Sequence, residues 1–380
     1  MDSRRQVSSS AVRAASPGRV EFIGNHVDYN GGRVLGAALN LGITATAIPR
    51  TDGRLTISSR GSPAIYEGIP GDNEPQSGQL SWVNYPLGIM AVLAEAGYVL
   101  SRGLDLSFTS DLPSGAGLSS SAAIELATME VLAVLEGFEL SRTEKVLLAQ
   151  RAENTFVGVP CGILDQAVSC FGKEDHLVCI DCAETTFDTV PLPPGLHFWI
   201  FNTNCKHSLV DSLYARRHAE CREALKWLRK EDPGLGYLVE AGREALHSLN
   251  RDPDIRRRAE HVIEENSRVS ACMEALERGA LDTVGDLLFA SHASSRDLFE
   301  NSTPELDALV EILEEYRGSG VVGARLTGGG FGGAVMALTT DAFTRDLADK
   351  VVAVYGERHS KAPTPGFLHV VTGEGTRLLD

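Results

Sequence analysis

The 380-residue chain has no long uninterrupted apolar run. A membrane-spanning helix needs about 18 to 20 consecutive apolar residues, and no segment approaches that length. The N-terminal stretch MDSRRQVSSSAVRAAS is rich in Arg and Ser, as transit peptides are, but it lacks the apolar core of a secretory signal and leads directly into a polar motif. We interpret it as a frayed tail and expect a cytoplasmic protein without a membrane partner.

Cysteines are few and are not spaced as a structural framework. Of the seven, only Cys179 and Cys182 form a CxxC pair, and no second pair is present to complete a zinc site. The odd number also argues against a fully disulfide-bonded secreted domain. The cysteine pattern therefore favours a reducing compartment.

Basic residues are fewer than acidic residues in this chain. The chain has 35 Lys and Arg against 51 Asp and Glu, a net charge of −16, which argues against binding to nucleic acid or to an anionic membrane. An anionic ligand must therefore be held by a local cationic pocket. The 43% of hydrophobic and 23% of charged residues are otherwise typical of a globular protein of two or three domains.

Strand and helix patterns are interleaved without a regular βαβ period, which favours the α+β class over a doubly wound sheet. We expect a hairpin of strands at 43–49 and 54–59 around the turn residues 51–53. Further strands are expected at 103–110, 176–182 and 197–203.

Two helices are predicted between these strands, and one linker follows them. Residues 122–138 carry so little charge that the helix must be buried. Ser141 with Glu144 forms a capping box that opens the next helix. The linker candidate PLPPG ends at Gly195, and we divide the chain there into domains 1–195 and 196–380.

The segment DLPSGAGLSSSAA, at 111–123, is a candidate phosphate-binding loop. Glycines let the backbone wrap closely around a ligand, and the helix that follows offers unpaired N–H groups and a partial positive charge. Ser119, Ser120 and Ser121 add hydroxyls that can face phosphate or Mg²⁺. A serine N-cap after a flexible turn is the simpler alternative. The pattern GxxxxGK[ST] is missing, which excludes a Walker loop.

The segment GARLTGGGFGGAV, at 323–335, matches GxGxxG, but its context does not fit a dinucleotide loop. Such a loop must open a helix, whereas the following residues AVMALTT are strand-like. We expect a loop between two strands whose missing side chains admit a ligand or another segment closely. A tight hairpin without a ligand remains the alternative.

Two acidic residues near 151–172 need an explanation. Asp165 lies among apolar residues, where an unpaired carboxylate is costly, so it requires a cationic partner. Glu153 on the preceding helix is either a metal ligand or part of a solvated helix face.

These segments, together with GRVEFIGNHVDYNGG at 18–32, resemble the three motifs of the GHMP small-molecule kinases, and among them most closely those of the galactokinases. GVPCGILDQ, SLYARRHAEC and SHASSRDLFENSTPEL also match, so the resemblance extends over nearly the whole chain from Ala14. It implies an N-terminal domain of the ribosomal S5 domain 2-like type and a ferredoxin-like C-terminal domain, with the active site in the cleft between them.

The resemblance also implies roles for individual residues, with ATP and Mg²⁺ as phosphoryl donor and cofactor. The catalytic pair would be Asp165 and Arg19. The sugar contacts would come from Asn25, His26, Asp28, Gly162 and Tyr214. ATP would be held by Trp82, Gly115, Gly117, Ser119, Ser120, Gly328, Gly329 and Gly330. The Mg²⁺ ligands would be Ser121 and Glu153.

The implied activity is phosphorylation of the anomeric hydroxyl of galactose. Asp165 would accept the hydroxyl proton while Arg19 steadies the developing charge. The usual family pattern is GRVNLIGEHTDY, and this chain has Glu21 and Asn25 where the pattern has Asn and Glu. In that family the glutamate contacts the sugar 6-hydroxyl, so Asn25 predicts a site more tolerant of change at carbon 6. Galacturonate and L-arabinose are therefore alternative substrates, and a non-catalytic sugar-responsive regulator is a further alternative.

Overall fold

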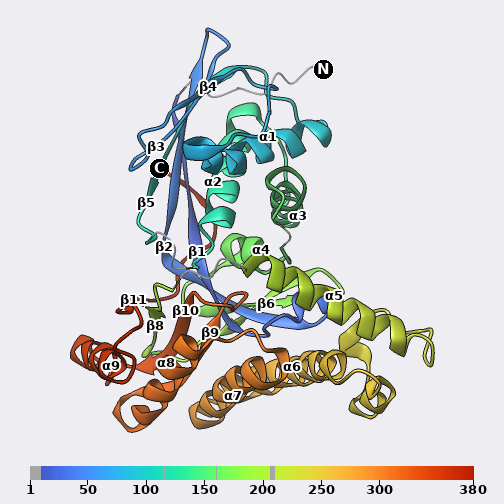
Figure 1. Cartoon of the computed structure of the whole chain (residues 1–380). Helices are drawn as coiled ribbons and strands as arrows, with labels where there is room; N and C mark the ends of the chain where they lie inside the picture. Colours follow the sequence, from blue (N-terminus) through green and yellow to red (C-terminus); the bar gives the residue numbers. More distant parts are fainter. Residues whose placement is uncertain (1–9, 114–116, 160, 206–209) are drawn as a thin grey trace.

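A computed structural model describes residues 10–113, 117–159, 161–205 and 210–380. The chain folds into two β-sheets with helices packed against them, so the predicted α+β class is confirmed (Figure 1). In the described part of the chain, no helix combines the length and the apolar character needed to cross a bilayer.

The first sheet is built around two long antiparallel strands, β1 (Val12–Ile23) and β2 (Arg33–Arg50). β1 also pairs with the C-terminal β12 (Arg377–Leu379). The other edge of β2 pairs with β6 at one end and with β5 at the other. The remaining strands of this sheet are β3 (Leu55–Ser59), β4 (Tyr66–Gly68), β5 (Gly103–Ser110), β6 (His176–Asp181) and β7 (Thr186–Pro191).

The predicted hairpin between residues 43–49 and 54–59 is wrong, although both segments are strands. β5 lies between β2 and β3, pairing antiparallel with β2 and parallel with β3. The turn around Gly53 therefore connects two strands that are not neighbours, because β5 lies between them in the sheet. The residues of the turn cannot reveal that a strand from later in the sequence is inserted there.

Helices cover one face of this sheet at the top of Figure 1. They are α1 (Asn84–Glu95), α2 (Ser120–Glu136), α3 (Arg142–Ala152) and α4 (Leu164–Phe171). α2 is almost entirely buried, as its lack of charge predicts, and it packs on β1 and β2. The predicted capping box is present, since Ser141 Oγ accepts from the Glu144 amide and Glu144 accepts from the Ser141 amide.

The second sheet has the order β11-β8-β10-β9. Its strands are β8 (Leu196–Asn202), β9 (Val321–Thr327), β10 (Ala334–Thr340) and β11 (Gly366–Val370). With sheet order 4-1-3-2 and helices in the crossovers, this is the expected ferredoxin-like arrangement. α8 (Pro304–Glu315) and α9 (Arg345–Arg358) enclose a small apolar core on one of its faces.

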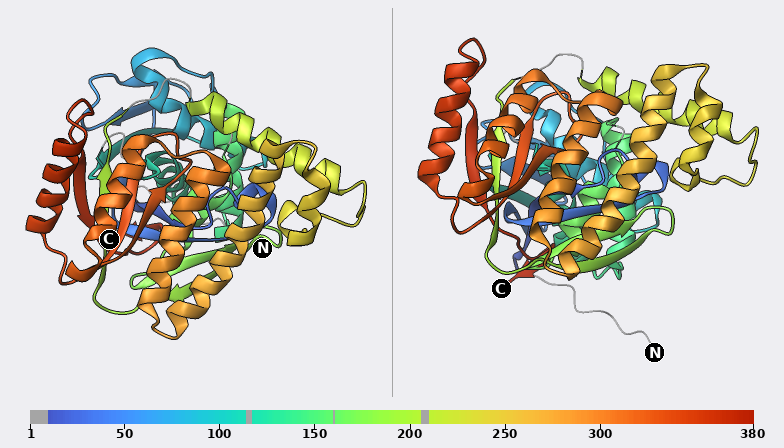
Figure 2. Two further views of the ribbon diagram at one scale, coloured as in Figure 1. Left: turned by 60° about the horizontal axis from the view of Figure 1, so that its bottom comes forward. Right: turned by 90° about the horizontal axis from the view of Figure 1, so that it is seen from below.

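A helical insertion separates β8 from β9 in the sequence. It consists mainly of α5 (Val210–Leu228), α6 (Pro253–Glu277) and α7 (Leu281–Ser294). α6 lies between α5 and α7, and α7 packs on β9. The right view of Figure 2 shows these helices from below. Short helical turns complete the chain: η1 (Asp28–Asn30), η2 (Gly78–Val83), η3 (Glu153–Val157), η4 (Leu238–Glu240), η5 (Arg243–Leu249), η6 (Ser295–Phe299) and η7 (Arg317–Ser319).

The two halves meet along the end of β1. Register shifts interrupt the β1–β2 pairing between Pro17 and Arg19 and again between Glu21 and Ile23, and such irregularities re-aim side chains near functional sites. We propose that the boundary between the two domains lies near Gly195, because β8, the first strand of the second sheet, begins at Leu196. The last strand, β12, nevertheless returns to the first sheet.

Glu265 on α6 holds the turn that follows β1. Its carboxylate accepts hydrogen bonds from the amides of Gly24 and Asn25 and from Ser291 Oγ, and it pairs with Arg268. Although burial opposes ionisation, the nearby positive charges, Arg268 foremost, and the hydrogen bond from Ser291 lower the pKa of Glu265 to about 2. Glu265 is thus a fully buried anion whose charge is compensated from several sides.

Glu265→Gln is expected to lower the free energy of unfolding at pH 7 by about 3 kcal/mol, measured by urea denaturation. Because the folded pKa is depressed, this stabilisation is fully present above pH 4.5 and is lost as the pH falls towards 2. The exposed Glu274→Gln on the same helix is the control, with a change within about 0.5 kcal/mol. Equal stabilities of the two variants would contradict a role for Glu265 in the fold.

Candidate active site

Two neighbouring cavities lie where the glycine-rich segments meet. The first has a volume of about 330 Å³ and is lined by β1, the turn at 25–28, parts of the segments 153–159 and 161–165, Tyr214 and the third glycine loop. The second, of about 670 Å³, lies between the start of α2 and the loop from Thr327 to Ala334. Each is large enough for a small molecule. Arg19 and Asp165 line both cavities, so they stand at the boundary between them.

Arg19 and Asp165 form the ion pair that the apolar surroundings of Asp165 require. Arg19 Nε donates to Asp165 Oδ1 at 2.8 Å, and Nη2 lies 2.6 Å from the same oxygen. Arg19 Nη1 donates to the carbonyl of Gly117 at 2.8 Å, and Ser119 Oγ donates to Asp165 Oδ2. The pair therefore joins β1, the start of α4 and the loop before α2.

The N-terminus of α2 faces the second cavity. Gly117 and Ser119 both have left-handed backbone conformations, with φ of 67° and 53°, and Ser119 is the residue before the first turn of the helix. Strain of this kind in a non-glycine residue is typical of ligand-binding turns. Ser120 and Ser121 follow in the first helical turn and line the same cavity. Gly115 lies outside the described residues.

The third glycine loop connects β9 to β10, as predicted, and bonds to the turn after β1. His26 Nε2 lies 3.0 Å from the Gly329 carbonyl, and His26 Nδ1 lies 2.9 Å from the Tyr29 hydroxyl. Burial lowers the pKa of His26 to about 3, so the ring is neutral, donating from Nε2 and accepting at Nδ1. Both ring nitrogens are therefore occupied by protein groups.

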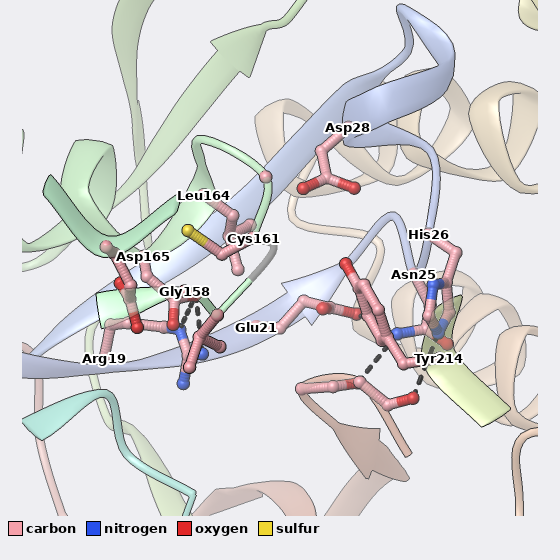
Figure 3. A pocket seen from close by; sticks show the side chains of 15 residues that line it. Arg19, Glu21, Asn25, His26, Asp28, Gly158, Cys161, Leu164, Asp165 and Tyr214 are labelled. Carbon is pink, nitrogen blue, oxygen red and sulfur yellow. Dashed lines mark hydrogen bonds and ion pairs between the residues drawn. The ribbon is translucent and has the colours of Figure 1, made fainter. Parts of the chain in front are cut away.

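Asp28 projects into the first cavity opposite Tyr214 (Figure 3). Burial raises the pKa of Asp28 to about 7, and the charges of Glu21 and Asp165 add to this effect. Gly162 packs against the same carboxylate so closely that a Cβ at this position would lie 1.5 Å from Asp28 Oδ2. Gly162 thus contributes by leaving room for Asp28.

Glu153 belongs to a buried acidic cluster and not to a solvated helix face. Its Oε2 accepts from Gln166 Nε2 at 2.6 Å, and Ser121 also hydrogen-bonds to it. Burial, and then the charge of Asp165, raise the pKa of Glu153 to about 7. Nearby Glu125 is fully buried and its Oε1 has no hydrogen-bond partner. Neither Glu125 nor Glu153 has an ion pair with a described Lys or Arg, which fits a place for a cation.

The described residues do not form a complete metal cage, since no group of three or more His, Cys, Asp or Glu side chains could hold an ion among them. Mg²⁺ usually takes only one or two carboxylates and completes its shell with phosphates and water. Ser121, Glu153 and the unpartnered oxygen of Glu125 therefore suit Mg²⁺ delivered with a nucleotide.

Trp82 does not line either cavity. It packs edge to face on Phe108, with ring centroids 6.1 Å apart, whereas Tyr85 of the same segment lines the second cavity. Two further acids, to which the sequence assigned no role at the site, are also found here. Glu21 lines the first cavity, and Glu125 adjoins Glu153. A single acid within an apolar strand or helix is the sequence signal that could have revealed them.

Comparison with known proteins agrees with this geometry. Residues 84–173 match the family described as GHMP kinases N terminal domain, residues 272–359 match GHMP kinases C terminal, and residues 4–49 match the galactokinase galactose-binding signature. The galactokinase of Roseiflexus sp. strain RS-1 is 39% identical over 89% of this chain and 86% of its own. The galactokinase of Bacillus subtilis strain 168 is 37% identical over 96% of this chain and 93% of its own.

Among solved structures, the Lactococcus lactis galactokinase complexed with galactose superimposes with a TM-score of 0.91 at 35% identity, covering 97% of this chain and 95% of that one. The likeness in sequence and in fold thus extends over both halves of the molecule. The chain therefore belongs to the GHMP kinase family and, within it, to the galactokinases.

Proposed function

We propose that the chain transfers the γ-phosphoryl group of ATP to the anomeric hydroxyl of galactose, giving galactose 1-phosphate and ADP. The observation that carries the proposal is the position of the Arg19–Asp165 pair at the boundary of two cavities. A sugar in the first cavity and a nucleotide in the second would meet at this pair. The galactokinase relatives and the galactose-bound structure support galactose as the acceptor.

The second cavity would hold the ATP phosphates. The free N–H groups at the start of α2 and the hydroxyls of Ser119 and Ser120 are suited to anionic oxygens, and Gly117 lets the backbone approach them. Gly115 is proposed for the same loop from the sequence motif. Residues Gly328 to Gly330 line the cavity from the other domain and would cover the nucleotide. Tyr85 lines this cavity and Trp82 does not, so Tyr85 is the better candidate for an aromatic contact with the nucleotide.

The first cavity would hold the sugar. Asp28 offers two carboxylate oxygens that can accept from vicinal hydroxyls, and Gly162 allows the carboxylate to stay there. Tyr214 lines the wall opposite and can support the ring or a hydroxyl. His26 would act indirectly, because its ring holds the third glycine loop in place.

In the proposed reaction the anomeric oxygen attacks the γ-phosphorus, its proton passes to an Asp165 carboxylate oxygen, and the bond to the β-phosphate oxygen breaks to release ADP. Arg19 balances the charge of Asp165 and lies at the site of phosphoryl transfer. Because phosphoryl transfer is largely dissociative, proton transfer can be late and a weak base suffices. Positioning by the two cavities would supply much of the acceleration.

Ser121 and Glu153 would hold Mg²⁺, with Glu125 beside them. A bound Mg²⁺ neutralises phosphate charge during transfer. Gln166 hydrogen-bonds to Glu153 Oε2 and thereby orients the carboxylate.

We also propose a reducing, cytoplasmic location for the protein. The seven cysteines are free thiols, which fits a reducing compartment. A non-catalytic regulator is disfavoured because the catalytic pair and the described part of the phosphate loop are both assembled.

The substrate is tested by measuring ADP release with galactose, galacturonate and L-arabinose in the presence of Mg²⁺ and ATP. We expect the highest kcat/KM with galactose. ATP turnover with none of these sugars would favour a sensor over an enzyme, and a preference for another sugar would replace galactose as the acceptor.

Asp165→Asn is expected to lower kcat by about 10²- to 10⁴-fold, because the amide cannot take up the proton of the attacking hydroxyl. ATP binding, measured by calorimetry, should persist. The exposed Asp188→Asn is the matched control and should keep wild-type kcat. Near-normal turnover by Asp165→Asn would remove Asp165 from its catalytic role.

Gly162→Ala is expected to raise KM for galactose by about 10-fold or more, because the new Cβ displaces the Asp28 carboxylate. KM for ATP should change little, since Gly162 lines only the sugar cavity. Gly318→Ala is the control, as no atom lies within 4 Å of a Cβ built there. Equal KM values for galactose in the two variants would show that Gly162 does not set the position of Asp28.

Glu153→Gln is expected to raise the Mg²⁺ concentration needed for half-maximal activity by about 10-fold, because one anionic ligand is lost. The exposed Glu139→Gln serves as the control. The measurement is a Mg²⁺ titration at saturating ATP and galactose. If the titration curve of Glu153→Gln overlays that of the wild type, Glu153 is a structural acid and not a ligand.

A further inference from the structure

The amide of Asn25 has no capacity left for a sugar. Nδ2 donates to Glu21 Oε1 and to the carbonyl of Gly328, each at 2.9 Å. Oδ1 accepts from Asn301 Nδ2 at 2.7 Å and from Ser295 Oγ at 3.3 Å. An amide side chain has two donor hydrogens and two acceptor positions, and here all four are used. With 1% of its surface exposed, Asn25 ties β1 to the third glycine loop and to η6.

Glu21, in contrast to Asn25, has a carboxylate oxygen without a hydrogen-bond donor among the described residues. The hydrogen bond from Asn25 and the 3.0 Å ion pair with Arg325 both involve Oε1, and no described residue donates a hydrogen bond to Oε2. The side chain lines the sugar cavity next to Tyr214 (Figure 3). Its carboxylate therefore presents a free acceptor oxygen to whatever occupies the cavity.

The position of Glu21 along β1 sets its distance from the reacting end of the sugar. Arg19 and Glu21 are two residues apart on one strand, so their side chains share a face about 7 Å apart. A hexose whose anomeric hydroxyl lies at Asp165 can span this distance to its far end. Asp28 faces the cavity from a separate wall, and it can take the ring hydroxyls (Figure 3). The hydroxymethyl group is the donor that remains for Glu21.

We propose that Glu21, and not Asn25, reads carbon 6 of the sugar, with Glu21 Oε2 accepting a hydrogen bond from the 6-hydroxyl. This inference rests on the proposed function, because it takes a galactose-configured sugar as the occupant of the cavity. It makes Glu21 a specificity-determining residue of the phosphorylation reaction.

The sequence departure then has a physical meaning. The family pattern has an amide at position 21 and a carboxylate at position 25, whereas this chain has Glu21 and Asn25. The two side chains hydrogen-bond to each other, so the exchange keeps one carboxylate and one amide in contact. Because a carboxylate still faces the cavity, the site should reject a sugar with a 6-carboxylate. The tolerance at carbon 6 that Asn25 alone predicts should therefore be absent.

Glu21 also belongs to the contact between the two sheets, which governs the choice of variant. Its amide donates to Thr327 Oγ1 at 2.9 Å, and Arg325 is wholly buried beside its carboxylate. Removing the side chain would leave Arg325 without its counter-charge. Glu21→Gln also removes the charge that faces Arg325, but it keeps the shape and an oxygen that can still accept a hydrogen bond from the guanidinium. Glu21→Asp keeps the charge while shortening the reach.

The experiment compares kcat/KM for galactose, 6-deoxygalactose and galacturonate in wild type, E21Q and N25A. In E21Q the preference for galactose over 6-deoxygalactose should fall by about 10-fold, since the hydrogen bond loses its charge assistance. Galacturonate should gain relative to galactose by a similar factor. In N25A all three sugars should lose activity in proportion, because only the support of the loop is weakened.

Two results would overturn the inference. One is a fall in E21Q that is equal for galactose and 6-deoxygalactose, which is what a purely structural role predicts. The other is a loss of discrimination in N25A. If E21Q does not fold, as judged by its circular dichroism, E21D takes its place and should show the same loss of discrimination; unchanged discrimination in E21D would likewise overturn the inference.

Failure of the proposed function is recognised separately. It would appear as a wild-type protein that does not phosphorylate galactose. Dissociation constants of galactose and 6-deoxygalactose, measured by calorimetry in wild type and E21Q, then test Glu21 without turnover. A wild-type preference for galactose that E21Q retains in these measurements would reject the role of Glu21.

Discussion

The ion pair between Arg19 and Asp165 is the contact on which the arrangement of the site depends. Asp165 lies in the first turn of α4, in an apolar segment where a carboxylate without a counter-charge would destabilise the fold. Arg19 comes from the middle of β1, and its guanidinium has enough donors to bond the Gly117 carbonyl as well. Ser119 completes the contact from the start of α2. One planar cation thereby fixes the loop before α2, the first turn of α4 and strand β1 relative to one another, at the boundary of the two cavities.

The motif at residues 18–32 contains many polar residues because it hydrogen-bonds to segments from both halves of the protein. His26 and Asn25 direct their side chains to carbonyls of the third glycine loop, while Glu265 bonds to the amides of the same turn. Besides Arg19, the motif presents the carboxylate of Asp28 and one oxygen of Glu21 to the first cavity. Several residues that look like sugar contacts in the sequence thus act by holding a loop, and the distinction becomes visible only when every hydrogen-bond donor and acceptor is counted.

The sequence predicted the class, most elements and the segments that form the site, because those properties rest on local patterns and on motifs with a fixed spacing. It missed what depends on distant pairing. The turn at Gly53 looks like a hairpin, yet β5 fills the space between its strands. Glu153 on a helix looks solvated in the sequence, but in the fold it is buried and hydrogen-bonds to Gln166 of α4 and to Ser121 of α2. Asn25 looks like a sugar contact until Asn301 and Ser295, more than 250 residues away, take its carbonyl.

The site brings together several buried carboxyl groups whose ionisation is opposed by burial. Burial raises the pKa of Asp28, Glu21, Glu125 and Glu153, so each carboxylate in its charged form destabilises the folded state. For a group with a raised folded pKa, this cost grows as the pH rises from the unfolded pKa to the folded one. The arrangement persists because the rest of the fold is stable enough to impose it. Hydroxyl donors from a sugar, and a cation beside Glu153, would lower the free-energy cost of these buried negative charges. Binding of the ligands would therefore also stabilise the folded state.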